Sequence, residues 1–540
     1  MADITAAGRR AAIARAGGRG LALAWPVIGG AMLGLSVAIF VLQPLWDDPS
    51  WYLYVASRWL AGAQLYGREL VDVDPPLIIW VSAIAVSLSH VLGVTSIVAL
   101  KLVLAAAIAG SIAWSVSLVR RFEGPGVDRL SRWLLVALLY VFVVYVPPLF
   151  AFGQREHFLA ILIMPYVTLT ATRLERQQVR RWEAAAIGLL AAIAVCLKPH
   201  HVLIIAALEA LAFWRLRAAA LAIRTELIAV TLGCLAYCAA VLVFTPDYLF
   251  KVLPLDWNAY LDWGRVPLLS LAYPVARLLK LLVLAALYAV SRRYLRHEAL
   301  VTSILTTGCA ALGAYVVQHK AGEYLILPAM IFFNLGALVI AIDALLRLAD
   351  SPERSLQMTK GATLALAVIG ALIGAAFAYR TVPPKFTSLI AEEAADDAAI
   401  GPLPAGAPIY EMTPDGFDPV LFDLIMRHDW RWASRFNGLW MLESIFEGKN
   451  APQTRDRARA DRLAAYVRNA VDKDFERRRP PIVFVERCAD ASVAPCYSME
   501  AFRIDLPTWL MQDPRFRTIW SRYKFKRSVG RYDLYTLESQ

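Results

Sequence analysis

Long apolar runs, separated by short loops that carry clusters of arginine, constrain this chain more than any other feature. Several runs reach the ~18–20 residues that an α-helix needs to cross a lipid bilayer. Hydrophobic residues make up 59% of the 540 residues and charged residues only 18%, whereas about a quarter of the residues in a soluble domain are charged. The sequence therefore predicts an α-helical polytopic membrane protein.

The arginine clusters predict the topology. Cytoplasmic loops carry an excess of Lys and Arg, and five clusters fit this rule: 120–132, 173–181, 215–224, 292–296 and 347–360. The formal net charge of +11 could also indicate nucleic-acid binding, but the basic residues lie between apolar runs, which favours the topological interpretation. Eleven crossings follow, at about 21–43, 95–119, 133–149, 157–172, 183–198, 202–214, 226–245, 269–290, 299–317, 325–346 and 361–379.

The first apolar run also predicts which side each loop occupies. It follows four arginines and is too long for the apolar part of a cleavable signal peptide, so we expect a cytoplasmic N-terminus and an outer loop at 44–94. Residues 76–91 would form a helix only about 24 Å long, short of the ~30 Å hydrocarbon core. We therefore assign this segment to the outer loop.

Residues 381–540 differ in composition from residues 1–380, which we assign to the membrane domain. Charged residues and loops dominate the tail, which predicts a small extracytoplasmic α/β domain. We expect buried strands at 408–410 and 481–485, a helix at 455–477 and a terminal hairpin at 523–537 with Gly530 near its turn.

The six cysteines agree with this assignment. Four lie in apolar runs, where cysteine behaves as a small hydrophobic residue. Cys488 and Cys496 lie in the tail, where an oxidising compartment favours a disulfide between them. Zinc binding is the alternative, but no histidine accompanies the pair nearby.

Unusual polar residues gather in the loops predicted to lie outside. Charged groups at the ends of membrane helices are costly unless they are solvated, paired or functional. The main groups are Asp47, Asp48, Asp72 and Asp74, then Gln154–His157, Lys198–His201 and Gln318–Tyr324. Any single one could be an interfacial anchor, but together they place carboxylates and cations on one face.

This combination matches the needs of transfer from a lipid phosphate. Cations stabilise the charge that develops on a departing phosphate, and a carboxylate can take the proton of an acceptor hydroxyl. The pair Asp47 and Asp48, with Arg155, Lys198 and Lys320, supplies both functions. Hydrolysis by two carboxylates is an alternative that leaves the excess of cations unexplained.

Several short motifs resemble the GT-C glycosyltransferase superfamily, especially its protein O-mannosyltransferase and lipid A aminoarabinose transferase branch. The first outer loop carries Asp47-Asp48, then Leu65-Tyr66 and Asp74-Pro75-Pro76-Leu77. Leu197-Lys198-Pro199 resembles a Thr-Lys-Gly motif of the family, and His319-Lys320 through Tyr324 resembles a later Lys-Gly-x-x-x-Tyr segment. The resemblance covers roughly residues 20–345, and Asp-Asp stands where Asp-Glu is commoner.

The resemblance implies an inverting transferase that moves a sugar from a polyprenyl-phosphate donor to an envelope acceptor outside the cytoplasm. The acceptor would be a lipopolysaccharide, glycolipid, polysaccharide or protein. Asp47 or Asp48 would be the base. The implied donor-phosphate ligands are Arg155, Lys198, His200, His201 and Lys320, and the implied acceptor or support residues are Arg58, Asp74, Glu156, His157 and Tyr324.

Some members of the superfamily use a divalent cation, so Mg²⁺ or Mn²⁺ could bind at Asp47, Asp48 and His200. The implied location is the bacterial inner membrane, with a periplasmic C-terminal domain. Two other classes remain open. A flippase of lipid-linked sugars would also need charges near helix ends, but inverted repeats are not evident. A scaffold whose tail binds a partner leaves the cations unexplained.

Overall fold

The computed structural model describes most of the chain and divides it into two compact units. The described residues are 25–43, 45, 48–123, 129–146, 151–217, 224–260, 275–320, 322, 324–349, 384–414, 416, 418–450, 452–490, 496 and 503–538. The first unit comprises Met1–Leu45, Val98–Cys238 and Val266–Val382, and the second comprises Trp46–Ile97, Ala239–Arg265 and Pro383–Gln540.

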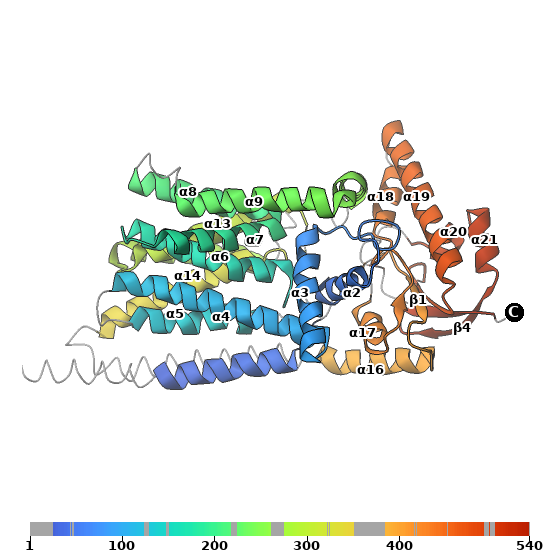
Figure 1. Ribbon diagram of the computed structural model, residues 1–540, viewed down its shortest axis with the longest axis horizontal. Coiled ribbons are helices and arrows are strands. Elements are labelled where there is room, and N and C mark those ends of the chain that lie inside the picture. Colours follow the sequence, from blue (N-terminus) through green and yellow to red (C-terminus); the bar gives the residue numbers. More distant parts are fainter. Residues whose placement is uncertain are drawn as a thin grey trace, which may run out of the picture. The chain divides into compact units, whose positions relative to one another are not determined.

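The first unit is a helical bundle (Figure 1). Its helices are Trp25–Leu42, α4 (Ser96–Glu123), α5 (Arg129–Leu139, extended by the π-helical turn η1, Tyr140–Val144), α6 (Arg155–Leu174), α7 (Arg181–Leu197), η2 (Pro199–His201), α8 (Val202–Leu216), α9 (Thr225–Phe244), α12 (Val275–Ser291), η6 (Arg292–Tyr294), α13 (Glu298–Gln318) and α14 (Leu327–Ala349). Ten of the predicted crossings are thus helical; the run at 361–379 lies outside the described residues.

Helix α6 lies at the centre of this bundle and packs against α7, α8, α13 and α14. It contains Pro165, which cannot donate a backbone hydrogen bond to the carbonyl of Ile161. The hydroxyl of Ser111 in α4 donates to that carbonyl instead, at 2.6 Å. Because a membrane interior holds no water to satisfy a free carbonyl, this bond allows a proline in the most buried span.

The arginine-rich loops meet at one end of the bundle. Ion pairs link successive loops: Arg121–Glu183 at 2.7 Å, Arg173–Glu226 at 3.2 Å and Arg215–Glu298 at 2.5 Å. The backbone N–H of Arg296 also donates to Asp343, near the end of α14, at 3.0 Å. The structure therefore gathers the first four clusters as predicted, whereas residues 350–360 of the fifth lie outside the described residues.

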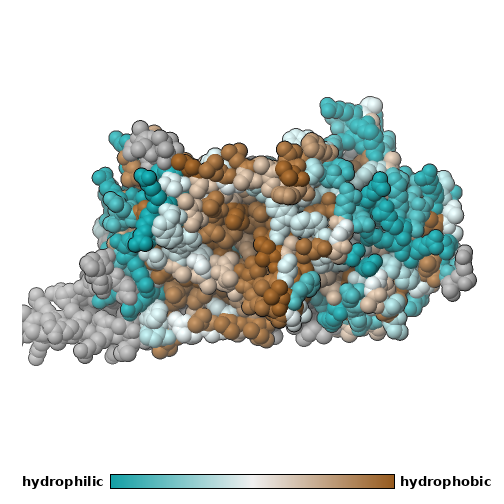
Figure 2. Space-filling model, in the orientation of Figure 1, coloured by the Kyte–Doolittle hydropathy of each residue, from teal (hydrophilic) through white to brown (hydrophobic). Residues whose placement is uncertain are grey.

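The bundle exposes apolar side chains widely, as Figure 2 shows. Six described helices are long and apolar enough to cross a membrane. Helix α9 is the clearest case, because Leu232, Leu235 and Phe244 are 59%, 61% and 72% exposed. Apolar surface on this scale is expected where lipid covers a protein, so the chain is a multi-pass membrane protein.

The second unit contains a five-stranded sheet in the order β2-β1-β3-β5-β4. Strands β1 (Pro408–Met412), β2 (Arg431–Trp432) and β3 (Ile482–Glu486) are parallel, and the hairpin β4 (Tyr523–Val529) and β5 (Tyr532–Leu537) adds antiparallel strands beside β3. The predicted strands and hairpin are confirmed. Strand β3 is buried along its whole length, as expected for a central strand covered on both faces.

Helices and short helical turns surround this sheet or join it to the first outer loop. They are α2 (Asp48–Leu60), α3 (Pro76–Leu92), η4 (Tyr248–Val252), α10 (Leu253–Leu255), η5 (Asp256–Tyr260), α16 (Pro384–Ile400), α17 (Pro419–Arg427), α18 (Met441–Asn450), α19 (Thr454–Arg478), α20 (Leu506–Leu510) and α21 (Pro514–Trp520). Asp418 and Asp513 each cap the helix that begins at the following proline, by accepting backbone N–H groups at 2.8 and 2.9 Å.

Helix α2 packs on the sheet domain through aromatic residues. The ring of Trp51 lies 5.7 Å from that of Phe422 and 6.2 Å from that of Trp432, and Tyr54 meets Phe422 edge to face at 5.5 Å. The backbone N–H of Trp432 donates to the Tyr54 hydroxyl at 2.9 Å. The outer loop and the tail therefore share one core.

Candidate functional site

The most unusual polar cluster lies at the end of the helical bundle opposite the arginine-rich loops. Helix α6 begins there, and the four residues Gln154, Arg155, Glu156 and His157 are all buried. Burying such groups is unfavourable unless they are paired or functional. The dipole at the amino end of α6 also favours a bound anion.

Lys198 lies against this helix end. It follows α7 directly, and its ammonium group pairs with the Glu156 carboxylate. The same ammonium lies 5.5 Å from the centre of the Tyr324 ring, within range of a cation–π interaction. Three segments that the sequence placed in separate outer loops therefore meet around one lysine. The second carboxylate oxygen of Glu156 has no hydrogen-bond partner among the described residues.

His200 and His201 lie next to this lysine, with ring centres 4.5 Å apart. Burial, and then the neighbouring His201 and Lys198, lower the pKa of His200 to about 3. Burial and then Lys198 likewise lower the pKa of His201 to about 3. Both imidazoles are therefore neutral near pH 7. They can donate a hydrogen bond to a phosphate, but they add no positive charge to it.

His157 stabilises the backbone before α6. Its Nδ1 accepts the backbone N–H of Gly153 at 3.2 Å, so its Nε2 carries the proton and donates to the carbonyl of Phe142 at 2.7 Å. Both ring nitrogens are thus occupied, and the ring fixes the turn before α6. Gln154 is fully buried, and neither amide atom has a partner among the described residues. The sequence placed Gln154 in this polar group but assigned it no role in the site.

Lys320 and Tyr324 belong to the segment between α13 and α14. Both are half-buried, and Lys320 comes two residues after the end of α13. A Cβ atom at Gly322 would lie 3.1 Å from the Tyr324 ring, so glycine leaves room for this ring. The structure brings Tyr324 to Lys198.

The first outer loop belongs to the second unit and is held by two buried carboxylates. Asp72 accepts the indole N–H of Trp51 at 2.6 Å, and Asp74 accepts the hydroxyl of Tyr52 at 2.6 Å. Tyr66 donates to the backbone carbonyl of Asp74 at 2.6 Å. Asp74 therefore acts as a support residue that fixes the loop to α2.

Of the two candidate bases, Asp48 is the first residue of α2, and Asp47 lies outside the described residues. Arg58 occupies the last turn of the same helix and lines a pocket with residues of the sheet domain. Within the second unit, Asp48, Arg58 and Asp74 thus share one helix and its supporting loop.

Among the described residues, two places offer atoms that could bind a metal ion. His200 Nε2 is buried without a hydrogen-bond partner and could serve as a ligand. The only group of described residues close enough to share an ion is Glu486, Cys488 and Cys496. However, the two cysteines form a disulfide, so they offer no thiolate, and the alternative of zinc binding by this pair is wrong.

The fold and site together define a class: a multi-pass helical bundle, with a buried cationic cluster at one end and an α/β domain built onto its first outer loop. Searches of protein-family models and of curated protein sequences found no match.

Among solved structures, the chain is similar to ArnT from Cupriavidus metallidurans bound to undecaprenyl phosphate, with 12% identity and a TM-score of 0.54 over 95% of this chain and 99% of that chain. The apo structure of ArnT gives 11% identity and a TM-score of 0.53 over 96% and 100%. An oligosaccharyltransferase from Archaeoglobus fulgidus matches at 12% identity with a TM-score of 0.43, over 94% and 74%. The ArnT structures show that this chain has the GT-C-type fold, so the predicted resemblance is confirmed for the fold.

Proposed function

We propose that this protein is an inverting glycosyltransferase that moves a sugar, a hexose or a pentose, from a polyprenyl-phosphate donor to an acceptor of the cell envelope. The observation that carries this proposal is the buried cluster at the start of α6, on a fold that matches ArnT over almost its whole length. That ArnT structure contains undecaprenyl phosphate, a ligand of the chemistry that Lys198 and Arg155 suit.

The role that we propose for each residue follows from the chemistry of its side chain. Arg155, Lys198 and the amino end of α6 stabilise the charge on the departing lipid phosphate. Glu156 holds the Lys198 ammonium in place, and neutral His200 and His201 donate hydrogen bonds. Lys320 adds a further cation. Asp47 or Asp48 takes the proton of the acceptor hydroxyl as that oxygen attacks the anomeric carbon and the phosphate leaves.

A divalent cation, if one binds, would be held by Asp47, Asp48 and His200 and would supply a further positive charge at the phosphate. We also propose that the protein lies in the bacterial inner membrane, with its N-terminus in the cytoplasm and its C-terminal domain in the periplasm. The arginine-rich loops at one end of the bundle support this orientation.

The experiment is transfer from a synthetic polyprenyl-phosphate sugar by the purified protein, with envelope extract from a deletion strain as acceptor. Asp48→Asn or Asp47→Asn should reduce turnover by roughly 10²–10⁴ and leave donor binding intact. Lys198→Ala and Arg155→Ala should weaken donor binding as well. Asp461→Asn, on the exposed face of α19, is the control.

Normal transfer by both aspartate variants would exclude the first loop as the source of the base. Translocation of intact donor across vesicles, without transfer, would support the flippase instead. Mass spectrometry of glycolipids and glycans from the deletion strain identifies the missing sugar and its acceptor.

A further inference from the structure

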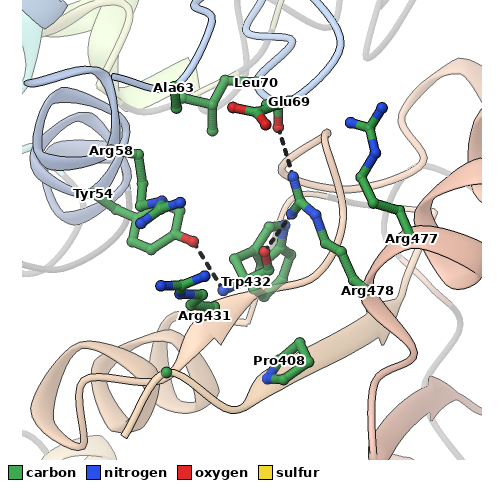
Figure 3. A pocket seen from close by; sticks show the side chains of 11 residues that line it. Tyr54, Arg58, Ala63, Glu69, Leu70, Pro408, Arg431, Trp432, Arg477 and Arg478 are labelled. Atoms are coloured by element: carbon green, nitrogen blue, oxygen red, sulfur yellow. Dashed lines mark hydrogen bonds between the residues drawn. The ribbon is translucent and has the colours of Figure 1, made fainter. Parts of the chain in front are cut away.

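A second cationic site lies within the second unit, apart from the residues assigned above to the lipid phosphate. It is a pocket of about 370 Å³, within the roughly 300–1,000 Å³ typical of small-molecule sites. Its lining includes four arginines and one carboxylate: Arg58, Arg431, Arg477, Arg478 and Glu69. Figure 3 shows Arg58 on one wall and Arg477 and Arg478 on the opposite wall.

One carboxylate, Glu69, lines this pocket with four guanidiniums, so most of their positive charge is not balanced by the lining. Arg58, Arg431 and Arg477 make no ion pair with any described carboxylate. Arg478 differs from these three arginines because its guanidinium donates hydrogen bonds to the backbone carbonyls of Trp432 at 2.7 Å and Glu69 at 3.2 Å. Arg478 thus holds the pocket wall, and the other three guanidiniums remain for a ligand.

Tyr54 provides an independent sign of a ligand. Its side chain is 5% exposed, and its hydroxyl accepts the Trp432 N–H at 2.9 Å. The hydroxyl proton has no acceptor among the described residues. Burial raises the pKa of Tyr54, although the hydrogen bond from Trp432 and then the charges of the neighbouring arginines act to lower it. A buried O–H donor therefore faces the same space as the arginines.

We propose that this pocket binds an acidic saccharide unit of the acceptor, with the arginines on its phosphate or carboxylate and the Tyr54 hydroxyl on a sugar oxygen. This assignment rests on the proposed transferase function. Guanidiniums suit planar or tetrahedral anions, and the mixture of charged and neutral donors suits a sugar better than a free ion.

The position of the pocket indicates which sugar of the acceptor carries the charge. Asp48 and Arg58 lie at opposite ends of α2, separated by ten residues, or roughly 15 Å along a helix. If Asp48 or its neighbour is the base, the anion lies a few sugar residues away from the hydroxyl that is glycosylated. The pocket would then select acceptors by a negative charge that lies far from the glycosylated hydroxyl.

The test is calorimetric titration of the full-length protein in neutral detergent with glucose 6-phosphate, glucuronate, glucose and inorganic phosphate. We expect the two acidic sugars to bind, glucose not to bind measurably, and phosphate to bind more weakly than glucose 6-phosphate. Arg431→Gln with Arg477→Gln should weaken acidic-sugar binding by at least about tenfold, and Tyr54→Phe by about fivefold.

Arg455→Gln with Arg462→Gln, an equal charge change at two exposed positions of α19, should change nothing. Both pocket arginines are exposed, so the double variant should unfold at the wild-type temperature. Undiminished binding by the double variant would overturn the proposal. So would equal binding of inorganic phosphate, or displacement of the sugar by phosphatidylglycerol in mixed micelles.

Binding of a polyprenyl phosphate, measured in the same preparations, separates the two hypotheses. The arginine variants should retain it fully. Its absence from the wild-type protein would contradict the transferase proposal, whatever the acidic sugars do.

Discussion

Lys198 and Glu156 carry opposite charges although both side chains are buried: they are 8% and 0% exposed. Breaking a buried pair leaves one charge without compensation, which typically costs about 3–5 kcal/mol. We therefore expect Lys198→Met to lower the unfolding temperature of the purified protein clearly, and to weaken donor binding.

The double variant Glu156→Gln with Lys198→Met separates stability from function. Removing both charges should restore most of the lost stability, while sugar transfer stays absent because the phosphate still lacks its lysine. Thermal unfolding and transfer assays on the same samples measure this. Full activity of the double variant would mean that the pair is only structural.

At the scale of elements, the contact between α7 and the start of α9 depends on a glycine. A Cβ atom at Gly188 would lie 2.3 Å from the backbone carbonyl oxygen of Glu226. Gly188→Ala must therefore push the two helices apart, and overpacking of this kind typically costs about 1–3 kcal/mol. We expect a lower unfolding temperature.

Gly110→Ala in α4 is the matched control, because a Cβ atom there meets nothing within 4 Å. Alanine also has the better helix propensity, so this variant should be neutral or slightly stabilised. Equal losses from both substitutions would contradict the close approach at Gly188.

Helix α16 contains a carboxyl group that titrates near neutral pH. Burial, and then the neighbouring Asp418 and Glu392, raise the pKa of Asp396 from 3.8 to about 7. The folded state thus keeps a proton that the unfolded state releases between about pH 4 and pH 7. The stabilisation from this group is fully present below about pH 4 and is lost as the pH rises from about 4 to about 7.

Asp396→Asn should therefore stabilise the protein most at pH 8, where the wild type buries a charge, and less at pH 5. The measurement is the unfolding temperature across this range. Asp461→Asn on exposed α19 should follow the wild-type profile. A destabilised Asp396→Asn at pH 8 would show that the charged form is the favoured one.

For the whole molecule, the orientation in the membrane decides whether the disulfide can form. Cys488 and Cys496 are bonded, and such bonds persist in oxidising compartments. We expect alkaline phosphatase fused after residue 540 to be active, because it folds only outside the cytoplasm. The same enzyme fused after residue 217, in an arginine-rich loop, should be inactive; the reverse pattern would invert the proposed topology.

The sequence alone determined the features that depend on local composition. Apolar runs set the helices, because each span must bury its own backbone hydrogen bonds in lipid. Arginine clusters predicted which loops share an end. Alternation and turn residues predicted β1, β3 and the terminal hairpin. The polar loops around Arg155, Lys198 and Tyr324 were also recognisable, since charge at a helix end is costly.

Tertiary structure alone decided how these segments pair. Nothing local in the sequence marks Glu156 as the partner of Lys198, 42 residues away, or shows that Gln154 is buried. The arginine pocket joins Tyr54 to Trp432, 378 positions apart. Such pairings depend on how helix α2 packs against the sheet, and packing depends on side chains that are distant in the chain. Hydrophobic pattern and charge predict that a segment is buried, but they do not predict which segment covers it.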